Sequence, residues 1–256
     1  MTDLPDQADL LELALSCADG ALALLMHLDD SKAREILNVE YGGRETKIRA
    51  DALLDQYLHE RLDGSGLSIL SEERISEFEE PQGASFWVVD PLDGSLNFLR
   101  GIGPSAISIG LWTNGGPALG VIASVASGDI SYGGSALGAW TNGSRIGTSQ
   151  VGEYSGATIA TGLPSRVSRA NDAQLLDRAA TVAPFGKVRM IGSATTSLLR
   201  LAQGGLDAYF EDGIMLWDVA AGLALVEGAG GSIQIEDVGK WSYRVWSSNG
   251  WLSNPS

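Results

Sequence analysis

The segment that most constrains this chain runs from Phe86 to Phe98 and joins an apolar run to a pair of acids. Its first four residues are Phe-Trp-Val-Val, which predicts a buried strand. We expect the strand to end at Asp90, because Pro91 cannot donate a hydrogen bond to a neighbouring strand. A carboxylate at the end of a buried strand is costly unless positive charge meets it.

Asp93 follows Asp90 after two intervening residues, so the two carboxylates flank one turn. Such a pair indicates ligands for a hard divalent cation such as Mg²⁺. Gly94 and Ser95 come next, and if a helix begins there, their backbone N–H groups face an anion. A metal site beside an anion site predicts phosphate chemistry. The alternative for the same residues is an ordinary turn with Asp93 as a helix N-cap.

The composition argues against several classes of partner. The chain of 256 residues has 17 Lys+Arg against 32 Asp+Glu, a net charge of −15. We therefore expect no nucleic-acid partner and no anionic membrane surface. Cys17 is the only cysteine, which excludes an intrachain disulfide. The first residues are acidic and no apolar run approaches about 20 residues, so we predict neither a secretory signal nor a membrane span. We therefore expect a cytoplasmic protein.

Periodicity gives a coarse map of the first half of the chain. Helical spacing of apolar residues predicts helices over about 7–28 and 48–62. The stretch between them, 39–47, indicates a surface loop or a short hairpin. A short strand over 67–70 precedes Glu72. After the central turn the sequence predicts an antiparallel meander, with strands over 106–112, 118–124, 130–132 and 136–140.

The second half alternates strands with helices. The sequence predicts strands over 158–161, 187–191, 206–210 and 232–235, and helices over 172–182, 194–202 and 217–228. That order indicates a sheet flanked by helices, and the whole chain is of the mixed α/β (α+β) class. The polar stretch 147–156 is the candidate boundary. It would divide one compact unit into an N-terminal part, 1–150, and a C-terminal part, 151–256.

Four further acidic residues stand near the ends of predicted elements. Glu72 closes the strand over 67–70, Glu211 ends the strand over 206–210, Asp218 opens the helix over 217–228, and Asp51 lies in the first turns of the helix over 48–62. Glu72 and Asp51 have simpler interpretations, as an exposed loop carboxylate and a solvated helix position. For Asp218 the simpler interpretation is a charge near a helix N-terminus, favourable by roughly 0.3–1 kcal/mol.

Taken together, these patterns resemble the inositol monophosphatase family, the lithium-sensitive, metal-dependent phosphomonoesterases. The family's first signature, W-x-x-D-P-[IL]-D-G-[ST]-x-N-F, is matched from Trp87 to Phe98. Its second signature, a Trp-Asp pair followed by small residues and a final Ala-Gly-Gly, is matched from Trp217 to Gly231. Glu72-Glu73 matches the family's upstream acidic pair. The resemblance covers nearly the whole chain.

The resemblance implies a layered α-β-α-β-α sandwich, two or three Mg²⁺ ions between its halves, and a homodimer. The implied metal ligands are Glu72, Asp90, the carbonyl of Leu92, Asp93 and Asp218. Asp93, Gly94 and Ser95 would bind the phosphate. Glu72, Ser95 and Asp51 would be catalytic, the last two by orienting or deprotonating the attacking water. Glu211 and the turn Gly192-Ser193-Ala194 would contact the alcohol part of the substrate.

The expected reaction is direct, in-line attack of metal-activated water on phosphorus. Uncatalysed hydrolysis of a phosphate monoester is among the slowest reactions known, and two metal ions can assist both the attacking and the leaving oxygen. His27 and His59 lie in helical patterns far from both signatures. Their positions argue against a phosphohistidine intermediate or a histidine base.

The substrate expected is a small polyol or sugar phosphate, such as an inositol monophosphate. This follows from the short connection after Asn97 and from the position of Glu211. The alternatives are a 3′-phosphoadenosine nucleotide or histidinol phosphate, or a catalytically silent binding protein. Several cations could approach the phosphate or a second anionic group: Arg44, Lys47, Arg100, Arg166, Arg169 and Arg189. For the arginines, an ordinary surface position is the simpler interpretation.

Overall fold

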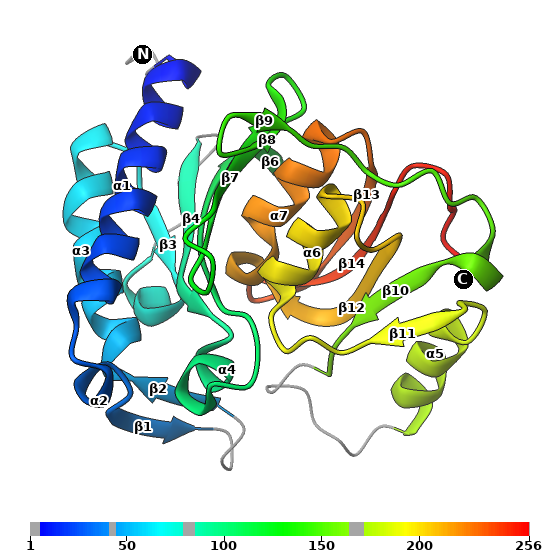
Figure 1. The fold of residues 1–256 in the computed structure, drawn as a ribbon, viewed down its shortest axis with the longest axis horizontal. Helices are drawn as coiled ribbons and strands as arrows, with labels where there is room; N and C mark the ends of the chain where they lie inside the picture. The colour runs from blue at the N-terminus through cyan, green and yellow to red at the C-terminus, as the bar shows by residue number, and fades with distance from the viewer. Residues whose placement is uncertain (1–5, 41–44, 79–84, 164–171, 256) are drawn as a thin grey trace.

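Two β-sheets alternate with three helical layers (Figure 1), in a computed structural model that describes residues 6–40, 45–78, 85–163 and 172–255. The first sheet has the strand order β3-β4-β5-β6-β7-β8-β9, and the second has the order β11-β10-β12-β14-β13. Helices α1 and α3 cover the outer face of the first sheet. Helices α6 and α7 lie between the two sheets, and α5 lies on the far side of the second (Figure 1). The expected α-β-α-β-α sandwich is confirmed.

The helices are α1 (Gln7–His27), α2 (Asp30–Ala33), α3 (Arg49–Leu62), α4 (Ser95–Arg100), α5 (Asp172–Val182), α6 (Ala194–Ala202) and α7 (Leu216–Gly228). Short 3₁₀ turns lie at Asp63–Ser65, Glu72–Glu77 and Tyr154–Gly156. The first sheet comprises β3 (Ile69–Ser71), β4 (Phe86–Asp93), β5 (Ala106–Thr113), β6 (Gly116–Ser124), β7 (Ile130–Gly134), β8 (Gly138–Thr141) and β9 (Ser144–Arg145). The second comprises β10 (Thr158–Thr161), β11 (Lys187–Arg189), β12 (Ala208–Met215), β13 (Ser232–Gly239) and β14 (Ser242–Ser248).

The first sheet is the expected meander, antiparallel throughout except for the parallel pair β3–β4. The stretch between α2 and α3 is a hairpin of β1 (Ile36–Glu40) and β2 (Glu45–Ile48), which settles the choice between loop and hairpin. The first sheet is built from residues before 150 and the second from residues after it. Helices α6 and α7 come from the second half, yet they pack on the first sheet as well. The division into 1–150 and 151–256 stays a prediction.

The expected end of the central strand at Asp90 is wrong. Strand β4 continues to Asp93, and its pairing with β5 shifts register on the way. Asp90 lies opposite Ser108, whereas Asp93 lies opposite Ala106. Three steps along β4 therefore match two along β5, which is a β-bulge. Pro91 is tolerated because a bulge residue does not have to donate to the ladder.

The expected end of β12 is also wrong. The strand runs past Glu211 to Met215, and its register with β14 shifts between Asp212 and Ile214. Glu211 is thus an internal strand residue rather than a terminal one. Strand β14, which lies between β12 and β13 in the second sheet, was not predicted.

Helix α1 corrects the expectation about apolar length. By length and composition alone it is long and apolar enough to cross a membrane. In the fold it carries a buried face that packs against α3 and the first sheet. That face consists of Leu10, Ala14, Cys17, Ala18, Ala21, Leu22 and Leu25.

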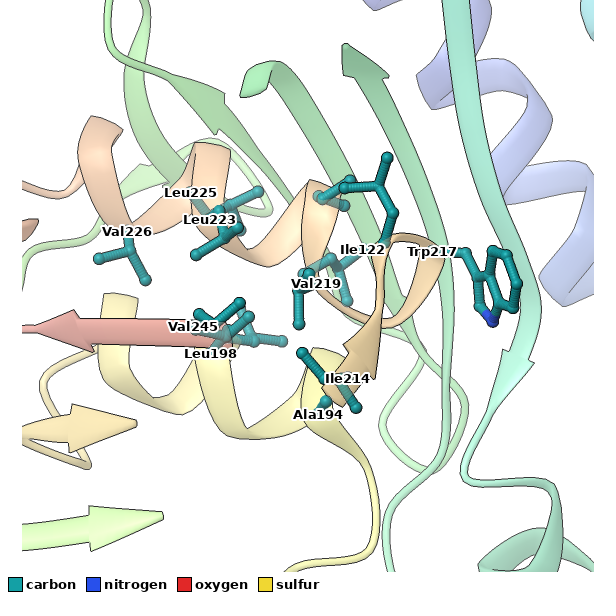
Figure 2. Packing of buried hydrophobic residues seen from close by; sticks show 14 of the residues in the cluster. Ile122, Ala194, Leu198, Ile214, Trp217, Val219, Leu223, Leu225, Val226 and Val245 are labelled. Atoms are coloured by element: carbon teal, nitrogen blue, oxygen red, sulfur yellow. The ribbon is translucent and has the colours of Figure 1, made fainter. Parts of the chain in front are cut away.

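The largest apolar cluster fills the space between the sheets. Figure 2 shows α7 side chains, among them Val219, Leu223 and Val226, above Leu198 of α6 and Val245 of β14. Helix α7 places the small residues Ala220 and Ala221 against the first sheet, which lets it approach the sheet closely. At Gly120 of β6, an added Cβ atom would stand 2.2 Å from the carbonyl oxygen of Ala221. This packing fixes the start of α7, and with it Asp218.

We expect Gly120→Ala to lower the free energy of unfolding by about 1–3 kcal/mol, because the new methyl group would push α7 off the sheet. Urea unfolding would measure the change. Gly116→Ala is the matched control in the same strand, since nothing lies within 4 Å of the Cβ it would add. Equal stabilities of the two variants would contradict the close packing of α7 on β6.

Candidate functional site

A cavity of about 520 Å³ opens between the first sheet, the second sheet and the starts of α6 and α7. Most of the residues singled out from the sequence line this one space. They are Asp51, Glu72, Asp90, Leu92, Asp93, Gly94, Ser95, Gly192, Ser193, Ala194, Glu211 and Asp218. Residues more than a hundred positions apart therefore meet, as the resemblance implies. The roles assigned to them individually stay predictions.

Three carboxylates form the centre of the cavity. Asp90 and Asp93 flank the bulge of β4, and Asp218 is the third residue of α7. One oxygen from each of these residues lies within 4.8 Å of the others. The Asp218 carboxylate is held by the backbone N–H of Met215, which donates to Oδ2 at 3.3 Å.

Burial makes this cluster electrostatically strained. Asp90 is 1% exposed, and the pKa of its carboxyl is raised well above the ordinary value. Loss of solvation is the main cause, followed by repulsion from Glu72, Asp93 and Asp218. Glu72 is outside the group of three, but its charge acts on Asp90 more strongly than either partner's. A bound cation would relieve all of these repulsions at once.

Asp93 is fixed from the opposite half of the molecule. Its Oδ2 accepts hydrogen bonds from Ser193 Oγ at 2.8 Å and from the backbone N–H of Thr195 at 2.6 Å. Burial raises the pKa of Asp93, while these bonds work against that rise. The alternative interpretation of Asp93 as an N-cap is not supported, since Gly94 is the N-cap of α4.

Asp51 and Ser95 form a separate polar pair beside the cluster. Ser95 Oγ lies 2.7 Å from Asp51 Oδ1 and 2.7 Å from the carbonyl oxygen of Leu92. The other carboxylate oxygen of Asp51 accepts the backbone N–H of Ile48 at 2.8 Å. Burial is the main cause that raises the pKa of Asp51 to about 7. A carboxyl with this pKa can exchange a proton near neutral pH.

Glu211 faces the cavity from the second sheet. Burial raises its pKa to about 7. On the same face of β12, the hydroxyl of Tyr209 is buried as well. Burial and then the charge of Glu211 raise the pKa of Tyr209. Burial therefore shifts both groups toward their neutral forms.

Asn97 joins the two halves of the site. Its Nδ2 is 2.9 Å from the carbonyl oxygen of Pro104, 3.0 Å from that of Ile191 and 3.3 Å from that of Gly192. Gly192 adopts a positive φ of 78°, and the chain then enters α6 through Ser193, whose side chain caps the helix. The turn Gly192-Ser193-Ala194 is thereby tied to α4.

The cations singled out from the sequence differ in where they lie relative to the cavity. Lys47 lines the cavity, and its Nζ is 2.9 Å from Glu73 Oε2. Arg100 and Arg189 are exposed and are not among the described lining residues. Arg44, Arg166 and Arg169 lie outside the described residues. Neither His27 nor His59 is among the described residues of the cavity wall.

Several residues that hold the site were missed in the sequence. Asn97 stands in the first signature without an assigned role, whereas Thr195 and Tyr209 carry no local signal. A buried network behind Glu72 was missed as well. In it Asp55 accepts hydrogen bonds from Ser71 Oγ at 2.5 Å and from Arg74 Nε at 2.6 Å. One indication of this network was present in the sequence, because Asp55 lies four residues after Asp51 and therefore on the same side of the helix.

The residues present fit a hard divalent cation. Carboxylate oxygens are the preferred ligands of Mg²⁺ and Ca²⁺, and three such groups converge here. The mutual repulsion that raises the pKa of Asp90 is the cost of assembling such a site in the absence of the ion.

Comparison with known proteins agrees with the geometry. The model of the inositol monophosphatase family matches residues 6–248. Among curated relatives, an inositol-1-monophosphatase from Mesorhizobium japonicum is 35% identical over 176 residues, covering 68% of this chain and 65% of the relative. The Nus factor SuhB of Xylella fastidiosa is 38% identical over 147 residues, covering 57% of this chain and 54% of the relative. The aligned segments thus span 54% to 65% of the length of these two relatives.

Solved structures align over more of the chain. The extragenic suppressor protein suhB from Bartonella henselae superposes with a TM-score of 0.80 at 25% identity, covering 95% of each chain. The inositol monophosphatase from Anabaena superposes with a TM-score of 0.77 at 29% identity, covering 95% of this chain and 92% of that one.

The metal-free protein should lose stability as the pH rises from 5.5 to 8. Asp51 and Glu211 have folded-state pKa values of about 7, above their ordinary values, so the folded state binds more protons in this range. Each group should contribute on the order of 1–2 kcal/mol to the loss. Thermal melts in EDTA would measure it, with Glu211→Gln as the variant that removes part of the slope.

Millimolar Mg²⁺ should raise the melting temperature more at pH 8 than at pH 5.5, because the cation binds the ionised carboxylates. Stability that increases with pH in EDTA, or the same Mg²⁺ effect at both pH values, would contradict this account of the cavity.

Proposed function

Because the chain belongs to the inositol monophosphatase family, we propose that it hydrolyses a small phosphomonoester in a Mg²⁺-dependent reaction. The observation that carries the proposal is the convergence of Asp90, Asp93 and Asp218 within one cavity. The Asp51–Ser95 pair and Glu211 line the same cavity. The three carboxylates of the cluster, the hydrogen-bonded Asp51 and the buried Glu211 therefore all border one space.

Asp90, Asp93 and Asp218 would hold the cation, with Glu72 and the carbonyl of Leu92 as further ligands for a second or third ion. When bound, the metal supplies Lewis acidity, which activates water, neutralises phosphate oxygens and stabilises the departing alkoxide. Gly94 and Ser95, at the start of α4, would receive the phosphate through their backbone N–H groups.

The Asp51–Ser95 pair would manage the proton of the attacking water. Ser95 Oγ is 2.7 Å from Asp51 Oδ1, so the hydroxyl can pass its proton to the carboxylate while it takes one from water. The water oxygen then bonds to phosphorus as the bond from phosphorus to the alcohol oxygen breaks. The alkoxide takes its proton from solvent. The chain thus needs no covalent intermediate.

Glu211 and the turn Gly192-Ser193-Ala194 would contact the alcohol part. The buried Glu211 carboxyl, with a pKa of about 7, can accept or donate a hydrogen bond to a hydroxyl group. A polyol or sugar monophosphate suits this wall. We also propose that the active protein is a cytoplasmic homodimer, as is common in the family.

Asp90→Asn should lower kcat by on the order of 100-fold or more in millimolar Mg²⁺, because it removes one charged ligand at the centre of the cavity. Release of inorganic phosphate from inositol 1-phosphate and glycerol 2-phosphate would measure the loss. Asp19→Asn, an exposed position on α1, is the matched control. Near-normal turnover by Asp90→Asn would refute the ligand assignment, and no turnover by the unmodified chain would favour a binding protein.

Asp51→Asn and Ser95→Ala should each lower kcat by about 100-fold if they handle the proton. In the unmodified enzyme kcat/KM should fall as the pH drops below about 7, since Asp51 must be ionised to accept a proton. Bound cation should shift this limb to lower pH. A kcat/KM profile that keeps the same acid limb in Asp51→Asn would assign the titration to another group.

A further inference from the structure

One wall of the cavity is apolar and open to solvent, and none of the roles proposed above uses it. Leu163 is 57% exposed, Met190 is 61% exposed and Leu96 is 47% exposed, and all three line the cavity. We call these three residues the apolar rim. Large exposed apolar groups gathered at a cleft mark a surface that binds something.

The sheet register places the apolar rim next to Glu211. In the parallel pair β10–β12, Thr161 lies opposite Phe210, so the residues after Thr161 run alongside Glu211. In the parallel pair β10–β11, Ala160 lies opposite Arg189, so Met190 comes level with Thr161. Leu163 and Met190 therefore leave the carboxyl ends of neighbouring strands at the edge of the sheet where Glu211 faces the cavity.

Leu96 reaches the same region from the first half of the chain. Its neighbour Asn97 is 3.0 Å from the carbonyl oxygen of Ile191, the residue after Met190. The apolar rim thus borders the cavity where α4 and the second sheet meet. The acidic triad lies deeper, on β4 and α7.

Charge in the cavity also limits the ligand. Lys47 is the single cation among the described lining residues, and it is paired with Glu73. Within that part of the wall nothing is arranged to receive a second phosphate, whereas three large apolar side chains remain uncovered. A substrate with one phosphate and a nonpolar portion would satisfy both ends.

We propose that the alcohol part of the substrate carries a nonpolar group or ring face, which packs on the apolar rim while its phosphate reaches the acidic triad. This inference rests on the proposed phosphatase function and refines its substrate class. Leu163 and Met190 are then specificity residues. They contact the alcohol part and leave the reacting phosphate untouched.

The test compares two phosphomonoesters that release aliphatic alcohols, 2-phenylethyl phosphate and glycerol 2-phosphate, in millimolar Mg²⁺. Leu163→Ser and Met190→Ser should each lower kcat/KM for 2-phenylethyl phosphate by about tenfold, mainly through KM. For glycerol 2-phosphate the change should stay within about twofold. Met190→Leu should keep the preference, because it keeps an apolar side chain of similar size.

Matched controls separate this effect from a general loss of surface apolarity. Leu176→Ser on α5 and Met26→Ser on α1 replace side chains that are 71% and 79% exposed and lie outside the described lining of the cavity. These two variants should leave kcat/KM unchanged for both esters. Thermal melts of all variants check folding.

Two failures are distinguishable. If the unmodified chain hydrolyses neither ester, the proposed phosphatase function fails and this inference with it. If it hydrolyses both, but the two serine variants lose both activities equally or lose neither, the apolar rim does not select the substrate and only this inference is overturned.

Discussion

The crowding of carboxylates in one buried cavity is the constraint on which the rest of the structure depends. Asp90 and Asp93 are almost fully buried and raise each other's free energy. The fold answers this repulsion with the beginnings of three helices. Asp51 and Asp218 each occupy the third position of a helix and accept its N-cap backbone N–H, while Asp93 accepts an N–H from the first turn of α6. Helix N-termini favour negative charge, so α3, α6 and α7 stabilise the acids before any cation arrives.

The layered core supplies the rigidity that such an arrangement needs. Helix α7 places Ala220 and Ala221 against the first sheet. Larger residues such as Val219 and Val226 point toward α6 and β14 (Figure 2). Because Gly110 and Gly120 let the α7 backbone approach closely, the second turn of α7 is set against β5 and β6. The position of Asp218 relative to Asp90 therefore follows from packing over a large area, rather than from contacts within the cavity.

The sequence predicted the layers and the acidic residues, because both leave local patterns. Helical periodicity located α1, α3, α6 and α7, and the two signatures located the triad. The errors lie where a local rule was overruled by strand pairing. Pro91 did not end β4, because the bulge absorbed it, and β12 continued through Glu211 because β14 pairs along its whole length. Contacts such as Thr195 to Asp93 and Asn97 to Ile191 join residues about a hundred positions apart, so no local pattern could reveal them.

The site is divided between the two sheets. Asp90 and Asp93 belong to the first, whereas Glu211 and the carboxyl ends of β10 and β11 belong to the second, and Asn97 of α4 donates a hydrogen bond to Ile191 after β11. Descendants of such a chain can therefore alter the edge of the second sheet, strand end by strand end, without disturbing the acids on the first. The proposed chemistry thus lies on one sheet and the proposed substrate contacts lie on the other, so the substrate contacts can vary while the metal site stays the same.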